Sequence, residues 1–210
     1  MYSAQVKHRE VFDAAFADPR HTSSIHPDQN VNEIIRERYS TDGTLALTKT
    51  QLWDMKVQKA RNPAKYLRPL IRPGSLKVFN VTHEGNIEFF TRVTVQRTWP
   101  RPNEFTTVIE QIRVDPDKQE VLFIGIPAAT GPDGEKYVSG VDQPLFHVEH
   151  AAKGTEDEPI DTWRIVLLTD GNDEQLLQNV NMPTLDPHLR LYSEIFIRET
   201  LGKALERKGE

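Results

Sequence analysis

The densest group of titratable side chains in this sequence is the run His147-Val148-Glu149-His150. In an extended strand, successive side chains point to opposite faces, so His147 and Glu149 share one face while His150 shares the other with Val148. The two histidines therefore cannot bind one metal ion together unless the strand bulges. If His147 points into a pocket, it is a candidate general base near neutral pH; the alternative is an exposed polar strand face.

Two further charged residues, Arg92 and Glu110, lie in segments that are typical of strands. Arg92 belongs to Ile87–Arg97, and Glu110 follows Val108 on one face of Phe105–Val114. A cavity-facing arginine or glutamate must be held by a partner, and it can then bind or polarise a substrate oxygen. The alternative is the solvent face of an antiparallel sheet. The mixed face around Glu110 makes it the more interesting carboxylate.

Aromatic residues supply candidates for the wall of a pocket. Pockets are mostly apolar with few polar groups, and Tyr192 is expected to offer a hydroxyl to a ligand. For each aromatic residue, plain packing in the core is the alternative. The other candidate lining residues are Trp53, Tyr66, Phe79, Phe123, Trp163 and Phe196.

Composition excludes several classes of function. The chain has 210 residues, of which 37% are hydrophobic and 27% charged, and it has no cysteine. This length suits one domain, or one domain with an arm. The missing cysteines exclude disulfides, thiolate zinc sites, iron–sulfur ligation and a cysteine nucleophile. A net charge of −5 gives no electrostatic case for binding DNA or RNA.

The widely used catalytic and targeting signals are also missing. There is no Walker A motif, dinucleotide-type glycine fingerprint, HExxH or G-x-S-x-G, which weakens nucleotide-dependent and serine-hydrolase interpretations. No apolar run is long enough for a membrane span, and Met1–Arg20 is too charged for a signal peptide. We therefore expect a cytoplasmic protein that uses neither a metal nor an organic cofactor.

The first part of the chain is interpreted as an N-terminal arm, residues 1–29, ahead of a ligand-binding domain, residues 30–210. Within the arm, Ala4–Ala17 is a candidate helix and Asp18–Gln29 is expected to be coil because of its polar composition and its prolines. The arm packs over the mouth of a pocket, packs against a second copy of the chain in a homodimer, or remains a tail.

A strand and two short helices are predicted next. Val31–Tyr39 is the candidate first strand. The stretch Leu47–Pro63 is a predicted helix, with Thr48 as N-cap and Gln51 as its capping-box partner. The dipeptide Asn62-Pro63 ends it, and a second short helical turn follows.

Six strands and a closing helix complete the prediction. Strands separated by turn signals, without helices between them, indicate an antiparallel meander. The six segments are Leu76–Thr82, Ile87–Arg97, Phe105–Val114, Val121–Ile126, Tyr137–Ala151 and Asp161–Thr169. The final helix, Leu185–Glu206, has Tyr192 and Phe196 on its apolar stripe, so these two should be buried while Arg190 and Glu194 are exposed.

This order of elements, together with the stretch from Leu47 to Pro63, resembles the START-like superfamily, also called SRPBCC or polyketide-cyclase-like, in a branch found in bacteria and fungi. The resemblance covers Val31–Glu206, and the arm and Thr130–Gln143 depart from the pattern. It implies an α+β helix-grip fold, in which a curved antiparallel seven-stranded sheet surrounds a long C-terminal helix with two short helices. It also implies a deep cavity between sheet and helix.

The resemblance implies binding of a hydrophobic small molecule. We expect a cofactor-free cyclase or isomerase of polyketide-like natural-product biosynthesis, acting by general acid–base catalysis. The alternative is a non-catalytic carrier or sensor of a hydrophobic metabolite: inward-facing ionisable residues favour the enzyme, and an all-apolar lining favours the carrier. A third interpretation is an interaction module that self-assembles through the arm. No nucleic acid or membrane partner is expected.

Overall fold

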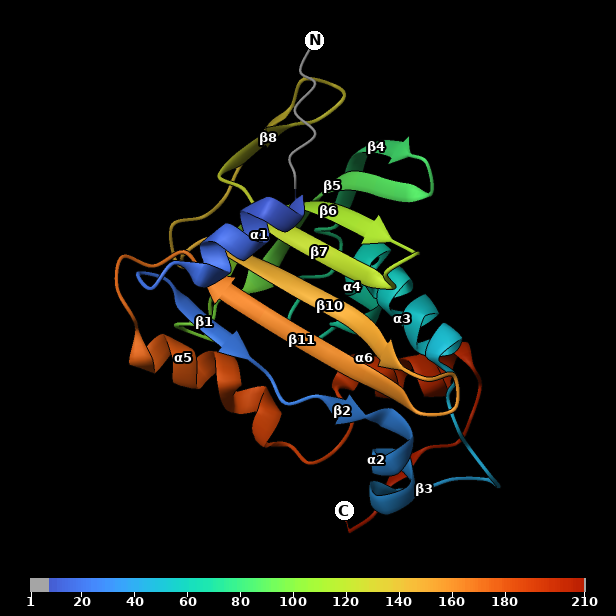
Figure 1. Cartoon of the computed structure of the whole chain (residues 1–210). Coiled ribbons are helices and arrows are strands. Elements are labelled where there is room, and N and C mark those ends of the chain that lie inside the picture. The colour runs from blue at the N-terminus through green and yellow to red at the C-terminus, as the bar shows by residue number, and fades with distance from the viewer. Residues whose placement is uncertain (1–7, 210) are drawn as a thin grey trace.

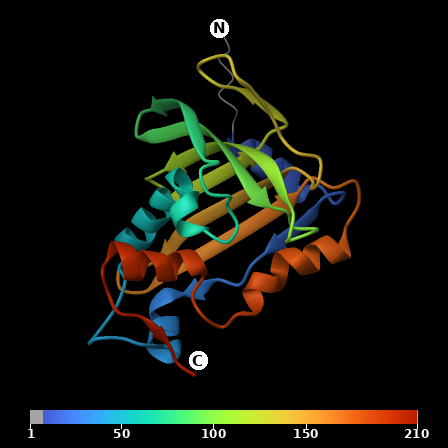
Figure 2. The ribbon, with the colours of Figure 1, turned by 180° about the vertical axis from the view of Figure 1, so that it is seen from behind.

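A large, curling antiparallel sheet is the centre of the computed structural model, which describes residues 8–209 apart from the side chains at 183 and 184 (Figures 1 and 2). From one edge to the other, the strands are β1 Thr22–Ile25, β11 Pro159–Leu167, β10 Phe146–Gly154, β7 Glu120–Gly125, β6 Phe105–Asp115, β5 Ile87–Arg97 and β4 Lys77–Glu84. An eighth described strand, β2 Gln29–Asn30, also pairs with β11. The predicted α+β class with a large antiparallel sheet is confirmed, but in the described residues this sheet has eight strands and not the predicted seven.

The predicted meander accounts for most of this sheet, with one correction. Strands β4 to β7, β10 and β11 follow one another as antiparallel neighbours. The segment Tyr137–Ala151, predicted as one strand candidate broken by Pro144, forms two separate strands, because the loop around Pro144 separates β10 from β9 Lys136–Val138. Strand β9 forms a separate hairpin with β8 Ala128–Thr130.

The predicted first strand, Val31–Tyr39, is wrong. Most of it is helix α2, Val31–Arg38, and Asn30 caps this helix by accepting a hydrogen bond from the backbone N–H of Glu33. Val31 and Ile35, four residues apart, are buried on one face, which is helical rather than strand spacing. The strands that replace it, β1 and β2, come from the segment expected to be coil.

Helix α1, His8–Ala17, covers the outer face of the sheet (Figure 1). Its Phe12 is buried in a cluster with Leu122, Ile124 and Val166 from the sheet. The predicted start of this helix at Ala4 lies outside the described residues. Because α1 lies on the outer face, this helix does not cover an opening on the inner face.

Helices α3, Lys49–Arg61, and α4, Pro63–Tyr66, lie against the inner face of the sheet (Figure 2). The predicted capping box between Thr48 and Gln51 is present, and Asn62 ends α3. The buried stripe of α3 consists of Leu52, Met55, Lys56, Lys59 and Ala60. Two lysines therefore occupy core positions of an otherwise apolar helix face.

The C-terminal helical segment is shorter than predicted. Helix α6, Leu191–Ile195, continues as the π-helical turn η2, Phe196–Thr200, and these ten residues replace the expected Leu185–Glu206. Gly202 adopts a left-handed φ of 63°, and the N–H of Lys203 donates to the carbonyl of Ile197, which is how helices commonly end at a glycine. The preceding residues form α5, Glu174–Asn181, and the 3-10 turn η1, Met182–Leu185.

Two side chains of this segment correct the predicted exposed face. Tyr192 and Phe196 are buried as expected, but Glu194 is also buried. Its carboxylate accepts hydrogen bonds from Tyr39 and Arg207. These two residues are register partners in the short pairing of β3, Tyr39–Ser40, with β12, Glu206–Arg207. The side chain of Arg190 is 9% exposed and forms an ion pair with Asp161. Ion pairing therefore allows charged residues to occupy this buried surface.

The inner face of the sheet thus packs against α3, and α4 and α6 pack beside α3, which is the helix-grip arrangement (Figure 2). No helix in the described part of the chain is long and apolar enough to cross a membrane.

Phe196→Ala should lower the free energy of unfolding by about 3–5 kcal/mol, because the change removes a buried ring from a packed cluster. Phe196 has no exposed surface, whereas Leu185 is 81% exposed and provides the matched control. Urea denaturation should show a loss below about 0.5 kcal/mol for Leu185→Ala. Equal losses in the two variants would mean that Phe196 does not lie in a packed core.

Candidate functional site

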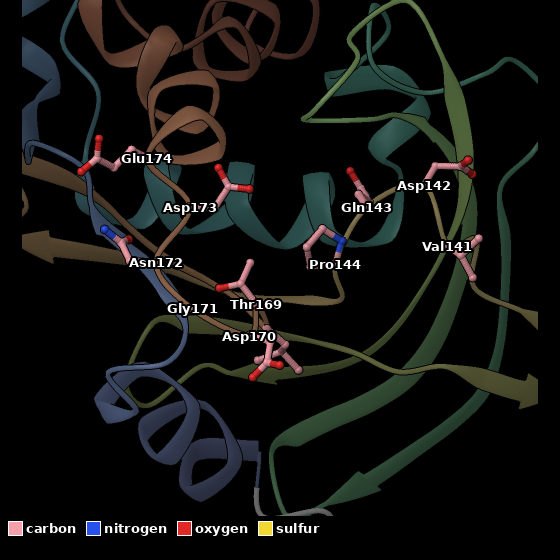
Figure 3. A pocket seen from close by; sticks show the side chains of 11 residues that line it. Val141, Asp142, Gln143, Pro144, Thr169, Asp170, Gly171, Asn172, Asp173 and Glu174 are labelled. Carbon is pink, nitrogen blue, oxygen red and sulfur yellow. The ribbon is translucent and has the colours of Figure 1, made fainter.

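A wide depression of about 860 Å³ lies at one edge of the molecule, between residues 141–144 and residues 168–174 (Figure 3). Three of its polar side chains are already engaged in the fold. Asp142 accepts from the hydroxyl of Thr106, Gln143 accepts from the backbone of Trp99, and Asp173 caps α5. This depression is open to solvent and is a poor site for chemistry that requires the exclusion of water.

A smaller cavity of about 110 Å³ lies between the inner face of the sheet, helices α3 and α6, and the loop that follows α4. It is lined by Lys59, Leu67, Leu70, Arg92, Gln96, Trp99, Glu110, Phe123, Phe146, Val148, His150, Trp163 and Tyr192. Leu67, Leu70, Gln96 and Trp99 retain exposure to solvent, whereas the charged side chains are buried. The cavity therefore has an apolar opening and an ionisable inner end.

Strand alternation brings the sheet residues to this cavity. Phe146, Val148 and His150 are every second residue of β10, so they share the inner face. His150 is the register partner of Trp163 on β11, and the planes of their rings are 9° apart with centroids 5.6 Å from each other. The antiparallel register therefore places a histidine and an indole side by side in the wall.

Arg92 and Glu110 form a buried ion pair across neighbouring strands, where they are register partners. Nε and Nη2 of Arg92 donate to the same oxygen, Oε2 of Glu110, at 3.0 and 2.5 Å. Nη1 of Arg92 donates to the carbonyl of Ala60 at 2.8 Å. Both bonds to Glu110 fall on Oε2, so Oε1 is the oxygen that can accept a proton from a ligand.

Lys59 and His150 form a second buried pair. Nζ of Lys59 lies 3.1 Å from Nε2 of His150 and 4.0 Å from the centroid of the Tyr192 ring. Lys59 makes no ion pair with any described carboxylate. A donated hydrogen bond from the amine to Nε2 places the proton of a neutral imidazole on Nδ1.

Asp161 holds together a third cluster next to this pair. Its carboxylate forms an ion pair with Lys56, a second with Arg190 at 2.9 Å, and accepts from the hydroxyl of Tyr192 at 3.0 Å. One buried carboxylate therefore compensates two buried cations. A further positive charge on Lys59 would find no compensation in this cluster.

Burial dominates the proton affinities of this region. Desolvation lowers the pKa of Lys59 well below its usual value, and the charge of Lys56 lowers it further. Desolvation and the charge of Lys59 lower the pKa of His150 well below its usual value. Burial, followed by the charge of Asp161, raises the pKa of Tyr192 well above its usual value. The amine, the imidazole and the phenol are therefore all favoured in their neutral forms.

Two polar atoms of the cavity wall make no hydrogen bond with any described residue: Nδ1 of His150 and Nε1 of Trp163. A buried N–H without a partner is costly, and such groups are commonly satisfied by water or by a ligand. These two atoms are therefore available to an oxygen of a bound molecule.

The structure gathers half of the predicted site residues and separates the others. Arg92, Glu110, Tyr192, Phe123 and Trp163 all line the cavity. The remaining predicted lining residues are packed elsewhere. Trp53 is half-buried between two core clusters, Tyr66 and Phe196 lie in the cluster around α3 and α6, and Phe79 lies in a separate cluster near β8 and β9.

His147 lies on the outer face of β10 and does not line the cavity. Its Nδ1 accepts from the backbone N–H of Gly125 at 3.2 Å, and burial lowers its pKa. The sequence indicated that His147 and His150 face opposite ways, and it is His150 that faces inward.

Sequence reasoning missed Lys56, Lys59 and Asp161. The signal for the lysines was their position on α3, at helical spacing from Leu52 and Met55. The signal for Asp161 was its alternation with Trp163 on β11. Within the described residues, no group of histidine, aspartate or glutamate side chains could hold a metal ion.

Several solved structures are similar to this one. The Zhui aromatase/cyclase from Streptomyces sp. R1128 aligns over 84% of this chain and 95% of its own, at 12% identity and a TM-score of 0.46. Ara h 8.0201 aligns over 83% and 99%, at 9% identity and a TM-score of 0.48. The di-domain aromatase/cyclase StfQ, from the steffimycin biosynthetic pathway, aligns over 81% and 48%, at 12% identity and a TM-score of 0.36.

No protein-family model matches the chain, and no curated protein matches its sequence. The three TM-scores above all lie below 0.5.

Asp161→Asn should lower the free energy of unfolding by about 3–5 kcal/mol, because it leaves two buried cations without their carboxylate. The pKa of Asp161 is lowered in the fold, so this stabilisation is present above pH about 4 and decreases only at lower pH. Glu199→Gln, which breaks the exposed pair with Arg68, is the control and should cost less than about 1 kcal/mol. Similar losses would contradict the role of Asp161.

Lys59→Met should remove a pH dependence of stability. A base whose pKa is lowered in the fold binds fewer protons there, so stability rises with pH between the folded and unfolded pKa values. Relative to Lys59→Met, the wild-type free energy of unfolding should rise by up to about 1.4 kcal/mol per pH unit below pH about 10. Urea denaturation at pH 7, 8 and 9 measures this difference. A difference that does not change with pH would indicate a charged Lys59.

Proposed function

We propose that the protein binds a small, largely apolar molecule in the inner cavity and converts it by general acid–base catalysis without a cofactor. The observation that carries this proposal is the combination of an apolar opening with four buried ionisable side chains at the inner end: Lys59, Arg92, Glu110 and His150. Burying such groups is costly, and it is typical of sites where their chemistry is used.

The Arg92–Glu110 pair supports proton abstraction. Arg92 fixes the carboxylate through Oε2, which leaves Oε1 to accept a proton from a C–H or O–H group of the bound molecule. The Nδ1–H of His150 and the indole N–H of Trp163, which have no hydrogen-bond partner among the described residues, would stabilise negative charge that develops on an oxygen of the bound molecule. Proton abstraction next to such an oxygen is the first step of isomerisation and of many ring closures.

The size of the cavity limits what is held at its inner end. Apolar cavities of roughly 150 Å³ admit benzene, and this one measures about 110 Å³. The reacting part of the ligand is therefore a fragment of a few heavy atoms, and a larger body extends through the opening past Leu67 and Leu70. A cyclase or isomerase of polyketide-like molecules fits this proposal if only one end of the substrate enters.

The alternative is a carrier or sensor of a hydrophobic metabolite. The apolar residues Phe123, Phe146 and Val148 in the wall favour this function. A carrier, however, gains nothing from burying a glutamate and three bases beside its ligand. The ionisable inner end therefore favours catalysis.

Native mass spectrometry of the protein purified from its own host should reveal a retained ligand, which then serves as the substrate or product in a turnover assay. Glu110→Gln should lower turnover by about 10²-fold or more, because it removes the proton acceptor, while the ligand still binds. Circular dichroism should first show that the variant is folded. Unchanged turnover would reject Glu110 as the base.

Variants of the two histidines of β10 test, in the same turnover assay, which face of the sheet carries the chemistry. His150→Gln should lower turnover, whereas His147→Gln should leave it within about twofold, because general acid–base effects require contact with the reacting atoms. A loss confined to His147→Gln would move the chemistry to the outer face. A wild-type protein that binds its ligand and converts nothing would support the carrier function.

A further inference from the structure

Two lysines of the described chain are buried, Lys56 and Lys59, and their amines have different partners. Nζ of Lys56 forms an ion pair with Asp161. Lys59 instead ends in the wall of the cavity, with a histidine nitrogen as its hydrogen-bond partner. An amine that is held by an imidazole rather than by a carboxylate can lose its proton without breaking an ion pair.

The charges around Lys59 favour its neutral form. The side chains that face it are Lys56, Asp161, Arg190, Arg92, Glu110, His150 and Tyr192. Asp161 is shared by Lys56 and Arg190, and Glu110 is held by Arg92, so each nearby carboxylate already has a cation. The lowered pKa of Lys59 agrees with this count of charges. A desolvated lysine beside another cation is a known way to prepare an amine for nucleophilic attack.

We propose that Lys59 is a nucleophile that forms an imine with an aldehyde or ketone bound in the cavity. This inference rests on the proposed function in one respect, which is that the cavity holds a small molecule. It adds the class of that molecule, a carbonyl compound, and a covalent step.

The step balances with the groups present. Nζ of Lys59 attacks the carbonyl carbon, and the carbonyl π electrons move to its oxygen. His150 Nε2, 3.1 Å from Nζ, accepts a proton from the amine nitrogen and returns it to the oxygen, which gives a carbinolamine. Loss of that oxygen as water, with a second proton from the nitrogen, forms the carbon–nitrogen double bond. The lysine and the carbonyl compound thus yield an imine and one molecule of water, with no oxidant or reductant.

Trapping with cyanoborohydride tests this inference. The wild-type protein is incubated at pH 7 with acetone, butanal or benzaldehyde, three probes that span the size of the cavity, and the reductant converts any imine to a stable secondary amine. Peptide mass mapping should place the modification at Lys59. An exposed lysine is neutral in only about one molecule in 10³ at this pH, so Lys59 should react roughly 10-fold or more faster than the exposed lysines.

Two controls accompany the trapping. Lys59→Met should abolish the fast modification, and Lys203→Met, at an exposed position, should leave it unchanged. In urea, where the cavity is lost, all lysines should react at similar rates. If Lys59→Met does not fold, the peptide map of the wild type and its loss of selectivity in urea still decide the question.

Modification of Lys59 at the rate of exposed lysines, or not at all with any of the three probes, would overturn the inference. The two proposals fail differently. If Glu110→Gln abolishes turnover of the retained ligand while Lys59 forms no adduct, acid–base catalysis stands without a covalent step. If the protein retains no ligand and converts none, the proposed function fails even where Lys59 is reactive.

Discussion

The structure depends on how the buried cations between α3, α6 and β11 are compensated. Asp161 stands on the inner face of β11 and meets Lys56 from α3 and Arg190 from the start of α6. This carboxylate therefore joins three elements that are distant in sequence: Lys56 lies 105 residues before Asp161, and Arg190 lies 29 residues after it. Because two cations share one carboxylate, Lys59, one helical turn further along α3, is left to pair with His150. The neutral amine that we propose for the cavity follows from this shortage of carboxylates relative to basic side chains.

The basic and acidic side chains that are buried between the sheet and the helices also occupy space there, which is why the cavity is small. In an α+β fold with an all-apolar inner face, the space between sheet and helices is divided between core side chains and an apolar void. Here long ionisable side chains reach into that space from both layers, Lys59 from the helix and Arg92 from the sheet. The amine of Lys59 and the guanidinium of Arg92 both lie over the ring of Phe123. The polar ends are thereby collected in one place, and the rest of the wall stays apolar.

Much of the sheet could be predicted from the sequence, because alternation and turn residues are local signals. Strand β5 was predicted with its observed bounds, and the capping box of α3 was read from Thr48 and Gln51. Helix α2 was missed although Asn30 and Glu33 are a helix start signal, because Val31 and Ile35 also suit a strand. The ionisable side chains buried on the inner face of the sheet were harder to predict. A lysine on a helix face is ordinarily solvated, and only the partner on a distant strand, Asp161 for Lys56, makes its burial tolerable.

The outer face of the sheet decides which histidine reaches the cavity. Glu149, next to His150 on β10, receives ion pairs from Arg9 of α1 and Arg164 of β11, both at 2.5 Å. A shift of β10 by one residue would move Glu149 and His147 to the inner face and His150 to the outer face. That shift would break both ion pairs of Glu149 on the outer face. The contacts of α1 on one side of the sheet therefore help to fix the histidine that pairs with Lys59 on the other.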